Sequence, residues 1–583
     1  MKQLTFVFFL AVFSTAAQSL NPSQKLSADL AATDPQAQCK IIVQWKHKPT
    51  EVQHQKVVSR GGTLQRSFST MTSAAYSLPF SALSALANDP EVVYITPDRP
   101  VHAKLDYTAA AVNASAAWNQ SFTGSGIGVA VIDSGLNANP DFDKHARIVY
   151  NQDFTGDITQ NANVLAPANA PDLYGHGEHV AGILGGNGTN SSCGACNRPL
   201  MGMAPGASIV NLRALDENGA GTDSTIIAAL DRAIALASTY NIRVINLSLG
   251  RPIYESYTLD PLCQAVETAW KAGIVVVVAA GNDGRDNSFG TNGYGTILVP
   301  GNDPYVITVG AMKTEGTNTR TDDLIASYSS KGPTLVDGFV KPDLVAPGNL
   351  VVSLLASTTA TLAVQYPANN MPRSYFTTHA NDSKPGNTFF QLSGTSMATA
   401  VVSGAAADLI QANPAMTPDQ VKARLMLTAY KTFPSSSVAS DPTTGQTYVS
   451  YYDIFTVGAG YLDIAAALAN QSLAQGSALS PTAVYNSSTG SIGIVTASSS
   501  VWGNSSVWGV STVWGNSTVW GNSTVWGNST VWGNSTVWGN STVWGVSLNA
   551  AAAQSMSNGV TVQPSASAAS QSTSLSIVVN GEN

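Results

Sequence analysis

Residues 273–282 read GIVVVVAAGN, a short apolar run that ends at Gly281 and Asn282. An apolar run of this length predicts a strand that is covered on both faces of a sheet. Four other segments of the same character flank it, namely IGVAVID (127–133), SIVNLRAL (208–215), IRVINLSLG (242–250) and YVITVGAM (305–312). The sequence therefore predicts several buried parallel strands in one domain.

Helical segments separate these strands. The stretch DSTIIAALDRAIALAS (223–238) has helical periodicity with Asp223 placed to cap it, and PLCQAVETAWKAG (261–273) ends at Gly273. Strands that alternate with helices predict an α/β fold, an open and mostly parallel sheet with helices on both faces. Ligands of such domains bind outside the carboxyl ends of the strands.

Composition narrows the class of protein. Only 11% of the 583 residues are charged, and the formal net charge is −8. Because no basic stripe is present to neutralise phosphates, nucleic acid is not expected as a partner. The segment MKQLTFVFFLAVFSTAAQS (1–19) has a lysine, an apolar run and then small residues, which is typical of a signal peptide. We expect a secreted protein. If it is held at a cell surface, we expect something other than a membrane-spanning segment to hold it there.

The pattern changes along the chain. Residues 39–105 contain a small α+β pattern with strands CKIIVQWK, SAAYSLP and EVVYITPD and a helix FSALSALAND. The α/β pattern follows over 108–470. After it we expect a Ser/Ala/Gly-rich linker (471–500), eight six-residue units that are mostly VWGNST (501–548) and a low-complexity tail (549–583).

The six-residue units each carry one tryptophan. Short strands could stack into a narrow solenoid that serves as a structural stalk or spacer. Alternatively, rows of exposed rings suit contact with polysaccharide or other cell-surface material. The sequence leaves both interpretations open.

The chain has four cysteines. Cys193 and Cys196 lie in the glycine-rich segment GNGTNSSCGACNRP, where an oxidising compartment favours a local disulfide. A zinc site needs two further ligands, and none is near in sequence. Cys39 and Cys263 lie far apart, and either could be a buried free thiol.

Three polar residues follow strands or begin helices. Asp133 ends VAVID, His176 lies in YGHGEHVAGILGG, and Ser396 lies in SGTSMATAVVSG. Each alone is typical of a turn, a cap or a packing residue. Together they have the order Asp, His, Ser, which is one of the orders known for a catalytic triad. A serine hydroxyl needs a base to take its proton, and the base needs an anion to orient it.

The segments VIDSG, HGEHVAG, VVVVAAGN and GTSMA resemble those of the subtilisin-like serine proteases over about residues 110–470. The resemblance implies that Ser396 attacks the scissile carbonyl, His176 acts as base and then acid, and Asp133 holds the imidazole. It implies Asn282 and the N–H of Ser396 as donors to the oxyanion. No cofactor is implied for catalysis, and the substrates would be proteins or peptides.

The resemblance also implies where a substrate strand would lie. It places main-chain binding edges at Ser248, Leu249 and Gly250 and at Ala279, Ala280 and Gly281, although small residues there would also allow tight strand packing. Asp141 in NPDF matches a calcium ligand of many relatives, but the segment 187–200 that would supply its partners differs from theirs, so a solvated helix-capping aspartate is the alternative.

Two residues near His176 and Ser396 differ from the usual residues of the family. Glu178 replaces the usual threonine, and we expect it to point away from His176 into a salt bridge or hydrogen bond. Ala400 replaces the usual proline, which a helix tolerates.

Residues 39–105 resemble the inhibitory pro-segment of the same family, an intramolecular inhibitor. Self-cleavage is then expected near Leu105–Tyr107. Two other classes of function compete with a protease: an adhesive protein whose protease domain has lost activity, and an esterase. An esterase of the α/β type would have a G-x-S-x-G motif and the order Ser, Asp, His, and neither occurs around Ser396.

Overall fold

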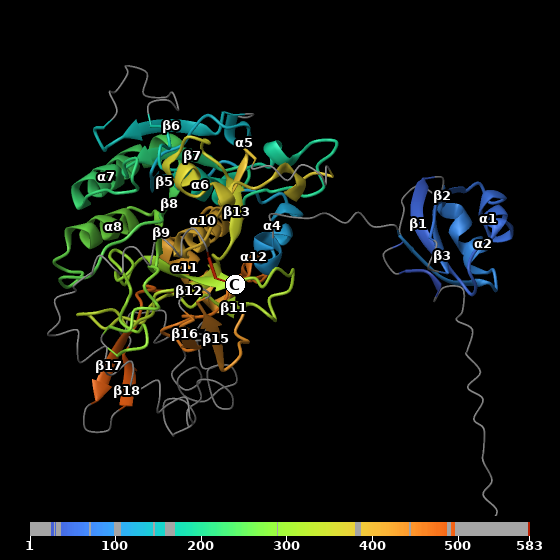
Figure 1. Cartoon of the computed structure of the whole chain (residues 1–583). Coiled ribbons are helices and arrows are strands. Elements are labelled where there is room, and N and C mark those ends of the chain that lie inside the picture. The colour runs from blue at the N-terminus through green and yellow to red at the C-terminus, as the bar shows by residue number, and fades with distance from the viewer. Residues whose placement is uncertain are drawn as a thin grey trace, which may run out of the picture. The chain divides into compact units, whose positions relative to one another are not determined.

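The computed structural model describes residues 25–27, 30, 37–68, 72–97, 107–143, 146–157, 170–288, 290–378, 386–441, 445–486, 491–495 and 581–582. It divides the chain into two compact units, Met1–His102 and Ala103–Asn583, which are considered separately (Figure 1). The expected signal peptide, the six-residue units and most of the low-complexity tail lie outside the described residues. Within the described part of the chain, no helix has the length and apolar character needed to cross a membrane.

The first unit contains a four-stranded antiparallel sheet with the order β2-β3-β1-β4. Its elements are β1 (Gln38–Trp45), α1 (Glu51–Val58), β2 (Thr63–Ser67), β3 (Ser73–Pro79), α2 (Leu83–Ala87) and β4 (Val92–Pro97). The three expected strands and the short helix are present, and α1 and β2 are additional. Trp45, Tyr76 and Leu86 belong to a core of this unit's own.

The second unit contains an eight-stranded sheet. Seven strands follow the order β11-β10-β9-β8-β5-β7-β6, and β12 also pairs with β10. All of these pairings are parallel except that of β10 with β11. The strands are β5 (Gly128–Asp133), β6 (Ile148–Asp153), β7 (Ser208–Arg213), β8 (Ile242–Leu247), β9 (Val275–Ala279), β10 (Ile307–Lys313), β11 (Leu324–Ile325) and β12 (Leu344–Pro347). The expected mostly parallel sheet is confirmed.

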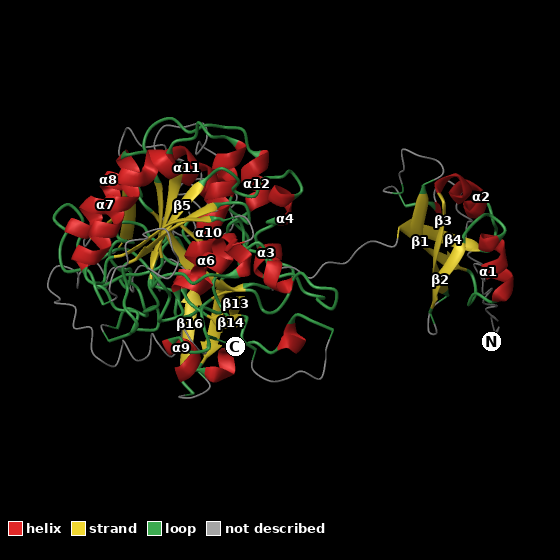
Figure 2. Ribbon diagram, turned by 90° about the horizontal axis from the view of Figure 1, so that it is seen from above, coloured by secondary structure: helices red, strands yellow, loops and turns green. Residues whose placement is uncertain are grey.

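Helices cover both faces of this sheet (Figure 2). One group packs against β5, β7, β8 and β9, and the other packs against β8, β9, β10 and β12. The first group is α7 (Asp223–Tyr240) and α8 (Pro261–Lys271); the second is α10 (Thr395–Ala412) with α6 (Gly177–Gly185) beside it. Residues 395–410 of α10 are all buried, so this helix runs through the interior of the unit.

Shorter helices and hairpins surround this framework. The helices are α3 (Thr108–Ala111), α4 (Ser115–Trp118), α5 (Pro140–Asp143), α9 (Thr361–Gln365), α11 (Pro418–Thr428) and α12 (Ile464–Ala469). The antiparallel hairpins are β13 (Val351–Leu354) with β14 (Phe389–Leu392), β15 (Ser436–Ser440) with β16 (Thr447–Tyr451), and β17 (Thr482–Asn486) with β18 (Ser491–Val495).

The cap of α7 differs from the expectation. Its N-cap is Thr222, whose hydroxyl accepts from the N–H of Thr225, and Asp223 is the first residue inside the helix. The Asp223 carboxylate instead pairs with Arg251. Helix α8 begins after Asp260, and Gly273 follows its end with a φ of +89°.

Part of the expected linker makes buried contacts within the second unit. Ser480 is buried, and its hydroxyl donates to the Asp343 carboxylate at 2.7 Å while it accepts from Lys422 at 3.0 Å. The N–H of Ala483 donates to the carbonyl of Gly338. Residues 478–483 therefore pack as part of the second unit, because they satisfy buried polar groups there.

Candidate active site

The topology brings Asp133 and Ser248 together. Strand β5 lies between β7 and β8, and the sheet then grows in opposite directions from it. The carboxyl ends at such a switch point leave room for a ligand. Ile132 in β5 is in register with Leu247 in β8, so Asp133 and Ser248 follow at neighbouring positions.

His176 is the N-cap residue of α6 and lies against Asp133. Its Nδ1 is 2.7 Å from Oδ1 of Asp133, and both side chains are buried. The same Oδ1 accepts from the N–H of Ser134 at 2.7 Å. A carboxylate that accepts from Nδ1 leaves Nε2 as the nitrogen that can take a proton.

A second buried carboxylate, Asp172, stands behind this pair. It accepts from the Ser134 hydroxyl at 2.8 Å and from the N–H groups of Gly175 and Glu178. Burial lowers the pKa of His176, but the charge and hydrogen bond of Asp133 and the charge of Asp172 outweigh burial and raise that pKa above its ordinary value. Sequence reasoning missed Asp172 because it lies in a loop without periodicity, four residues before His176.

Ser396 is the second residue of α10, which Gly394 precedes as the N-cap. Its hydroxyl donates to the carbonyl of Ser248 at 3.2 Å, and the hydroxyl of Ser248 donates to the carbonyl of Ser396 at 3.0 Å. Ser248 neighbours Asp133 in the sheet and α10 packs against α6, so Asp133, His176 and Ser396 lie on neighbouring elements of the unit. The N-terminus of α10 also favours negative charge at Ser396.

Asn282 lies beside this turn. Its Oδ1 accepts from the N–H of Thr395 at 2.9 Å and from the Thr395 hydroxyl at 3.1 Å. The amide oxygen is thereby committed, and the Nδ2 group is the donor that Asn282 can present to another molecule. Gly394 has a φ of +147°, and a Cβ there would lie 3.2 Å from Asn282 Nδ2. Only glycine combines this backbone with this space.

The two predicted substrate edges follow β8 and β9. The main-chain N–H groups of Leu249 and Gly250 have no hydrogen-bond partner within the described residues, and Gly250 is exposed, so this edge can accept a peptide strand. In contrast, Ala280 and Gly281 use their N–H groups inward, toward Val309 and Thr395. These two N–H groups are therefore not available to a substrate strand.

Leu298 lies between the two segments. A Cβ at Gly250 would be 2.9 Å from Leu298 Cβ, and one at Gly281 would be 2.7 Å from Leu298 Cγ. The N–H of Leu298 also donates to the carbonyl of Ala280. None of the sequence motifs quoted above contains Leu298, because contacts between segments that are distant in the chain place it here.

Glu178 points away from His176. Its carboxylate accepts from the N–H of Asn137 at 2.8 Å and from Nδ2 of Asn139 at 2.9 Å. Burial raises the pKa of Glu178 well above its ordinary value. His179 is a packing residue: burial and nearby His176 lower its pKa to about 3, and its Nε2 lies 3.1 Å from the carbonyls of Val351 and Phe390.

The contacts of Asp141 do not fit a calcium ion. One carboxylate oxygen accepts from the N–H of Gly188 at 2.9 Å and the other from the N–H of Asn190 at 2.7 Å. Calcium needs six to eight oxygen ligands, whereas N–H donors occupy both oxygens here. In the described ranges, no group of three or more His, Cys, Asp or Glu side chains is arranged to hold a metal ion.

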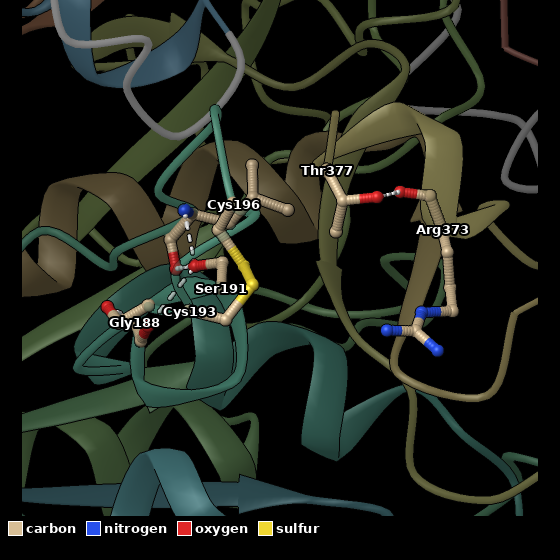
Figure 3. Close-up of a disulfide and its surroundings, with 8 residues drawn as sticks. Gly188, Ser191, Cys193, Cys196, Arg373 and Thr377 are labelled. Atoms are coloured by element: carbon tan, nitrogen blue, oxygen red, sulfur yellow. Dashed lines mark hydrogen bonds between the residues drawn. A yellow bond between two sulfur atoms is a disulfide. The ribbon is translucent and has the colours of Figure 1, made fainter. Parts of the chain in front are cut away.

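The predicted local disulfide joins Cys193 and Cys196 (Figure 3). A short 3₁₀ turn precedes it, in which Ser191 bonds back to the carbonyl of Gly188. Cys196 forms an antiparallel bridge with Thr377, whose hydroxyl donates to the carbonyl of Arg373. The disulfide loop is thus attached to the segment that follows α9. Cys263 is a buried free thiol and Cys39 a half-buried one.

An open α/β sheet whose carboxyl edge holds a buried Asp–His pair, a serine at a helix N-terminus and an adjacent amide donor defines a serine hydrolase. Comparison with known proteins shows to which family of serine hydrolases the chain belongs. The model of the subtilase family matches residues 124–460. The chain belongs to the subtilase family and is a serine-type endopeptidase.

Several individual relatives are similar to the chain. Serine protease AprX of Bacillus subtilis (strain 168) is 37% identical over 336 residues, 56% of this chain and 66% of AprX. Subtilisin E of the same organism is 31% identical over 436 residues, 73% of this chain and 91% of subtilisin E. An extracellular serine proteinase of Thermus sp. (strain Rt41A) is 33% identical over 370 residues, 60% of this chain and 69% of that protein. The chain thus spans just under two thirds of AprX and most of subtilisin E.

Proposed function

We propose that this protein is a secreted endopeptidase that hydrolyses peptide bonds through Asp133, His176 and Ser396 and that matures by removing its own residues up to about 105–107. The observation that carries the proposal is the 2.7 Å contact of His176 Nδ1 with the buried Asp133 carboxylate. Ser396 lies at the start of α10, which packs against the helix that His176 caps. A base oriented in this way is what a serine nucleophile requires.

The geometry supports a two-stage reaction. His176 Nε2 takes the Ser396 proton as the hydroxyl attacks the scissile carbonyl, and Asp133 stabilises the imidazolium that forms. The amide N–H of Asn282 and the main-chain N–H of Ser396 donate to the oxyanion. The imidazolium then protonates the leaving amine, and an acyl-enzyme remains. Water, deprotonated by His176, releases the acyl group and restores Ser396.

Peptide substrates fit the exposed edge at Leu249 and Gly250. The unpaired N–H groups there would bond to a substrate backbone added as a strand, and Ala279–Gly281 would form the facing wall. The Ser396 hydroxyl would leave the Ser248 carbonyl when it attacks, which frees that carbonyl as a further acceptor.

Removal of the first unit is the second part of the proposal. Residues 39–105 would occupy the cleft until export and would then be released by cleavage near Leu105–Tyr107. The apolar segment at residues 4–13 supports export, and so does the similarity to the extracellular serine proteinase of Thermus sp. (strain Rt41A). Contact of the tryptophan repeat with polysaccharide or a cell surface is part of this proposal and depends on the aromatic rings alone.

The decisive experiment compares the full chain with Ser396→Ala. We expect roughly a 10⁶-fold loss of peptide hydrolysis, the size of effect that loss of a triad serine has in this family. Mass spectrometry should show removal of residues before about 108 in the native chain and retention of them in the variant.

Two results would contradict the proposal. Maturation of the purified Ser396→Ala chain in the absence of other proteases would show that Ser396 does not perform the processing. A native chain that neither hydrolyses peptides nor reacts with a serine-directed covalent inhibitor would instead favour the inactive-scaffold function.

A further inference from the structure

Glu582 lies near the carboxyl end of the sequence, yet its side chain is only 1% exposed. It is bound within the second unit, next to the last residue of β10 and to residues that follow β11 and β12 (Figure 1). The sequence does not predict this, because residues 549–583 are low in complexity and glutamate is rarely buried without partners.

The Glu582 carboxylate has cationic and neutral donors on Oε2 and a cation beside Oε1. Oε2 accepts from Arg285 at 2.9 Å, from the N–H of Ser327 at 2.9 Å and from the Ser327 hydroxyl. Oε1 lies 3.2 Å from the ammonium of Lys313. The other carboxylates at these two cations, Asp441 and Glu315, are the more exposed ones, so Glu582 is their buried counter-ion.

The main chain of Glu582 is recognised as well. Its N–H donates to Oδ1 of Asn349 at 2.9 Å, and its carbonyl accepts from Nδ2 of the same side chain at 2.6 Å. One asparagine therefore bonds the backbone as a neighbouring strand would, while Arg285, Lys313 and Ser327 bind the carboxylate.

The site also restricts which residue can precede Glu582. Gly581 has a φ of +64°, and a Cβ there would lie 2.4 Å from Leu350 Cδ2 and 2.6 Å from Ser393 Oγ. The site accepts a residue without a side chain followed by an acidic one. A pocket of about 550 Å³, whose walls include Lys313, Asn349, Glu582 and Tyr375, adjoins it.

This carboxylate site adjoins two segments of the proposed active site. Arg285 follows Asn282 by three residues. Asn349 follows Gly348, whose carbonyl accepts from the N–H of Gly394 at 2.7 Å, and Ser393 contacts Gly581. Glu582 thus ties together the loop that carries Asn282 and the turn that leads to Ser396.

We propose that Arg285, Lys313, Ser327 and Asn349 form a binding site for an acidic residue, that Glu582 of the same chain occupies it, and that its occupancy holds the Asn282 loop and the Ser393–Ser396 turn in place. The existence of the site is inferred from the contacts of Glu582 alone, whereas its effect on catalysis rests on the proposed function.

The test measures amide hydrogen exchange in the full chain carrying Ser396→Ala, so that self-digestion does not enter. Glu582→Ala should accelerate exchange in residues 282–288 and 393–396, the loop and the turn named in the proposal, by about tenfold or more, the factor that corresponds to roughly 1.4 kcal/mol. Glu255→Gln, at an exposed glutamate of the same unit, is the matched control and should leave both segments unchanged. Glu582→Gln keeps the shape and should have an intermediate effect.

Chemical rescue distinguishes a carboxylate site from general loosening. Propionate should restore slow exchange in the Glu582→Ala chain, and sodium chloride at the same ionic strength should not. Unchanged exchange in Glu582→Ala, or equal rescue by chloride, would overturn the proposal.

Activity is measured separately in the chain that keeps Ser396. Glu582→Ala should lower kcat by about tenfold and leave KM for a short peptide nearly unchanged, because the oxyanion donors lose their support. If exchange changed but kcat did not, the binding site for Glu582 would stand, and the claim that it supports catalysis would be wrong. Loss of exchange protection remains measurable even if Ser396 proves not to be the nucleophile.

Discussion

At the scale of single residues, the proposed chemistry depends on groups that are held by others. Asn282 can offer Nδ2 because Thr395 binds its oxygen, and His176 is oriented because Asp133 accepts from Nδ1. Gly394 and Asp172 touch no reacting atom in this scheme, yet each fixes the position or charge of a group that does. Both can be tested by substitution.

Gly394→Ala should lower kcat by about 10² to 10³, which is the usual cost of losing one oxyanion donor. The added methyl group would lie 3.2 Å from Asn282 Nδ2, on a backbone with a φ of +147°. Steady-state kinetics should show the loss in kcat with little change in KM.

The control for Gly394→Ala is Gly273→Ala. Gly273 also has a positive φ, +89°, but its Cβ would meet nothing within 4 Å. That variant should lose about 1 kcal/mol of stability and keep its kcat. Equal losses of kcat in the two variants would mean that backbone strain, rather than crowding of Asn282, causes the effect.

Asp172→Asn should shift the acid limb of the kcat/KM profile to lower pH. The charge of Asp172 contributes to the raised pKa of His176, and activity is lost as pH falls through that pKa because protonated His176 cannot act as a base. Removing the charge lowers the pKa, so activity persists to lower pH.

A pH series of kcat/KM with Asp231→Asn, an exposed aspartate on α7, as the reference measures this shift. A limb that stays in place or moves to higher pH would exclude an electrostatic role of Asp172. The Asn variant should also be less stable by about 1 to 3 kcal/mol, since one of the three donors to Asp172 loses its acceptor.

At the scale of elements, apolar runs predicted the strands that are buried on both faces, β5 and β7 to β10. The pattern was silent on β6, an edge strand with polar side chains, and on β2, whose five residues are all exposed. Side chains of edge strands need not be apolar, so their pairing is decided by the neighbouring strand. Asp223 was predicted to cap α7, but Thr222 is the N-cap, and Asp223 is the first residue of the helix and pairs with Arg251. The sequence could not separate these two roles, because the ion pair depends on where the fold places Arg251.

The residues of the candidate site also fall into those that the sequence predicts and those that it does not. Asp133, His176, Ser396 and Asn282 stand in short local motifs, and local motifs can be read from sequence. Asp172, Leu298 and Glu582 act through contacts between residues that are distant in the chain, and no periodicity marks them. The sequence left Asp141 open between a calcium ligand and a capping residue, because the N–H groups that its carboxylate accepts come from the segment 188–190, whose turn no local motif predicts.

Asp260→Ala should cost about 2 kcal/mol of stability. The buried Asp260 carboxylate accepts from the N–H groups of Leu262 and Cys263 at the start of α8 and from Arg251 at 2.8 Å. The substitution therefore removes a helix cap and a partner of Arg251 together.

Urea unfolding of the Ser396→Ala chain measures this loss. Thr222→Ala removes the exposed cap of α7 and should cost about 1 kcal/mol, so it serves as the comparison. If Asp260→Ala cost no more than Thr222→Ala, the contact with Arg251 would contribute nothing measurable.

At the scale of the whole molecule, the two units have separate cores, and the proposal assigns them to successive stages of the protein's life. Trp45 is 2% exposed in the first unit and makes an edge contact with Tyr76, with ring centroids 6.5 Å apart. Damage to that core should affect the production of the enzyme without affecting the finished enzyme.

Trp45→Ala, which should remove about 3 kcal/mol or more from the first unit, should reduce the yield of matured protein. The kcat of the molecules that do mature should be unchanged, because they no longer contain the substitution. Active-site titration of the secreted fraction gives both values. Val52→Ala, at a side chain that is 65% exposed, should change neither. A lowered kcat in matured Trp45→Ala protein would mean that the first unit is not removed.

Ser396 is attached to a deeply enclosed helix, since residues 395–410 of α10 are all buried, and every residue of α6, the helix that begins after His176, is buried as well. Elements of this kind lose their structure only when the whole unit opens. Heat inactivation of the mature enzyme should therefore proceed at the rate of global unfolding, and the half-life of activity at high temperature becomes a direct measure of kinetic stability. For engineering, substitutions that lengthen that half-life should be sought wherever they slow the opening of the unit, however far they lie from Ser396.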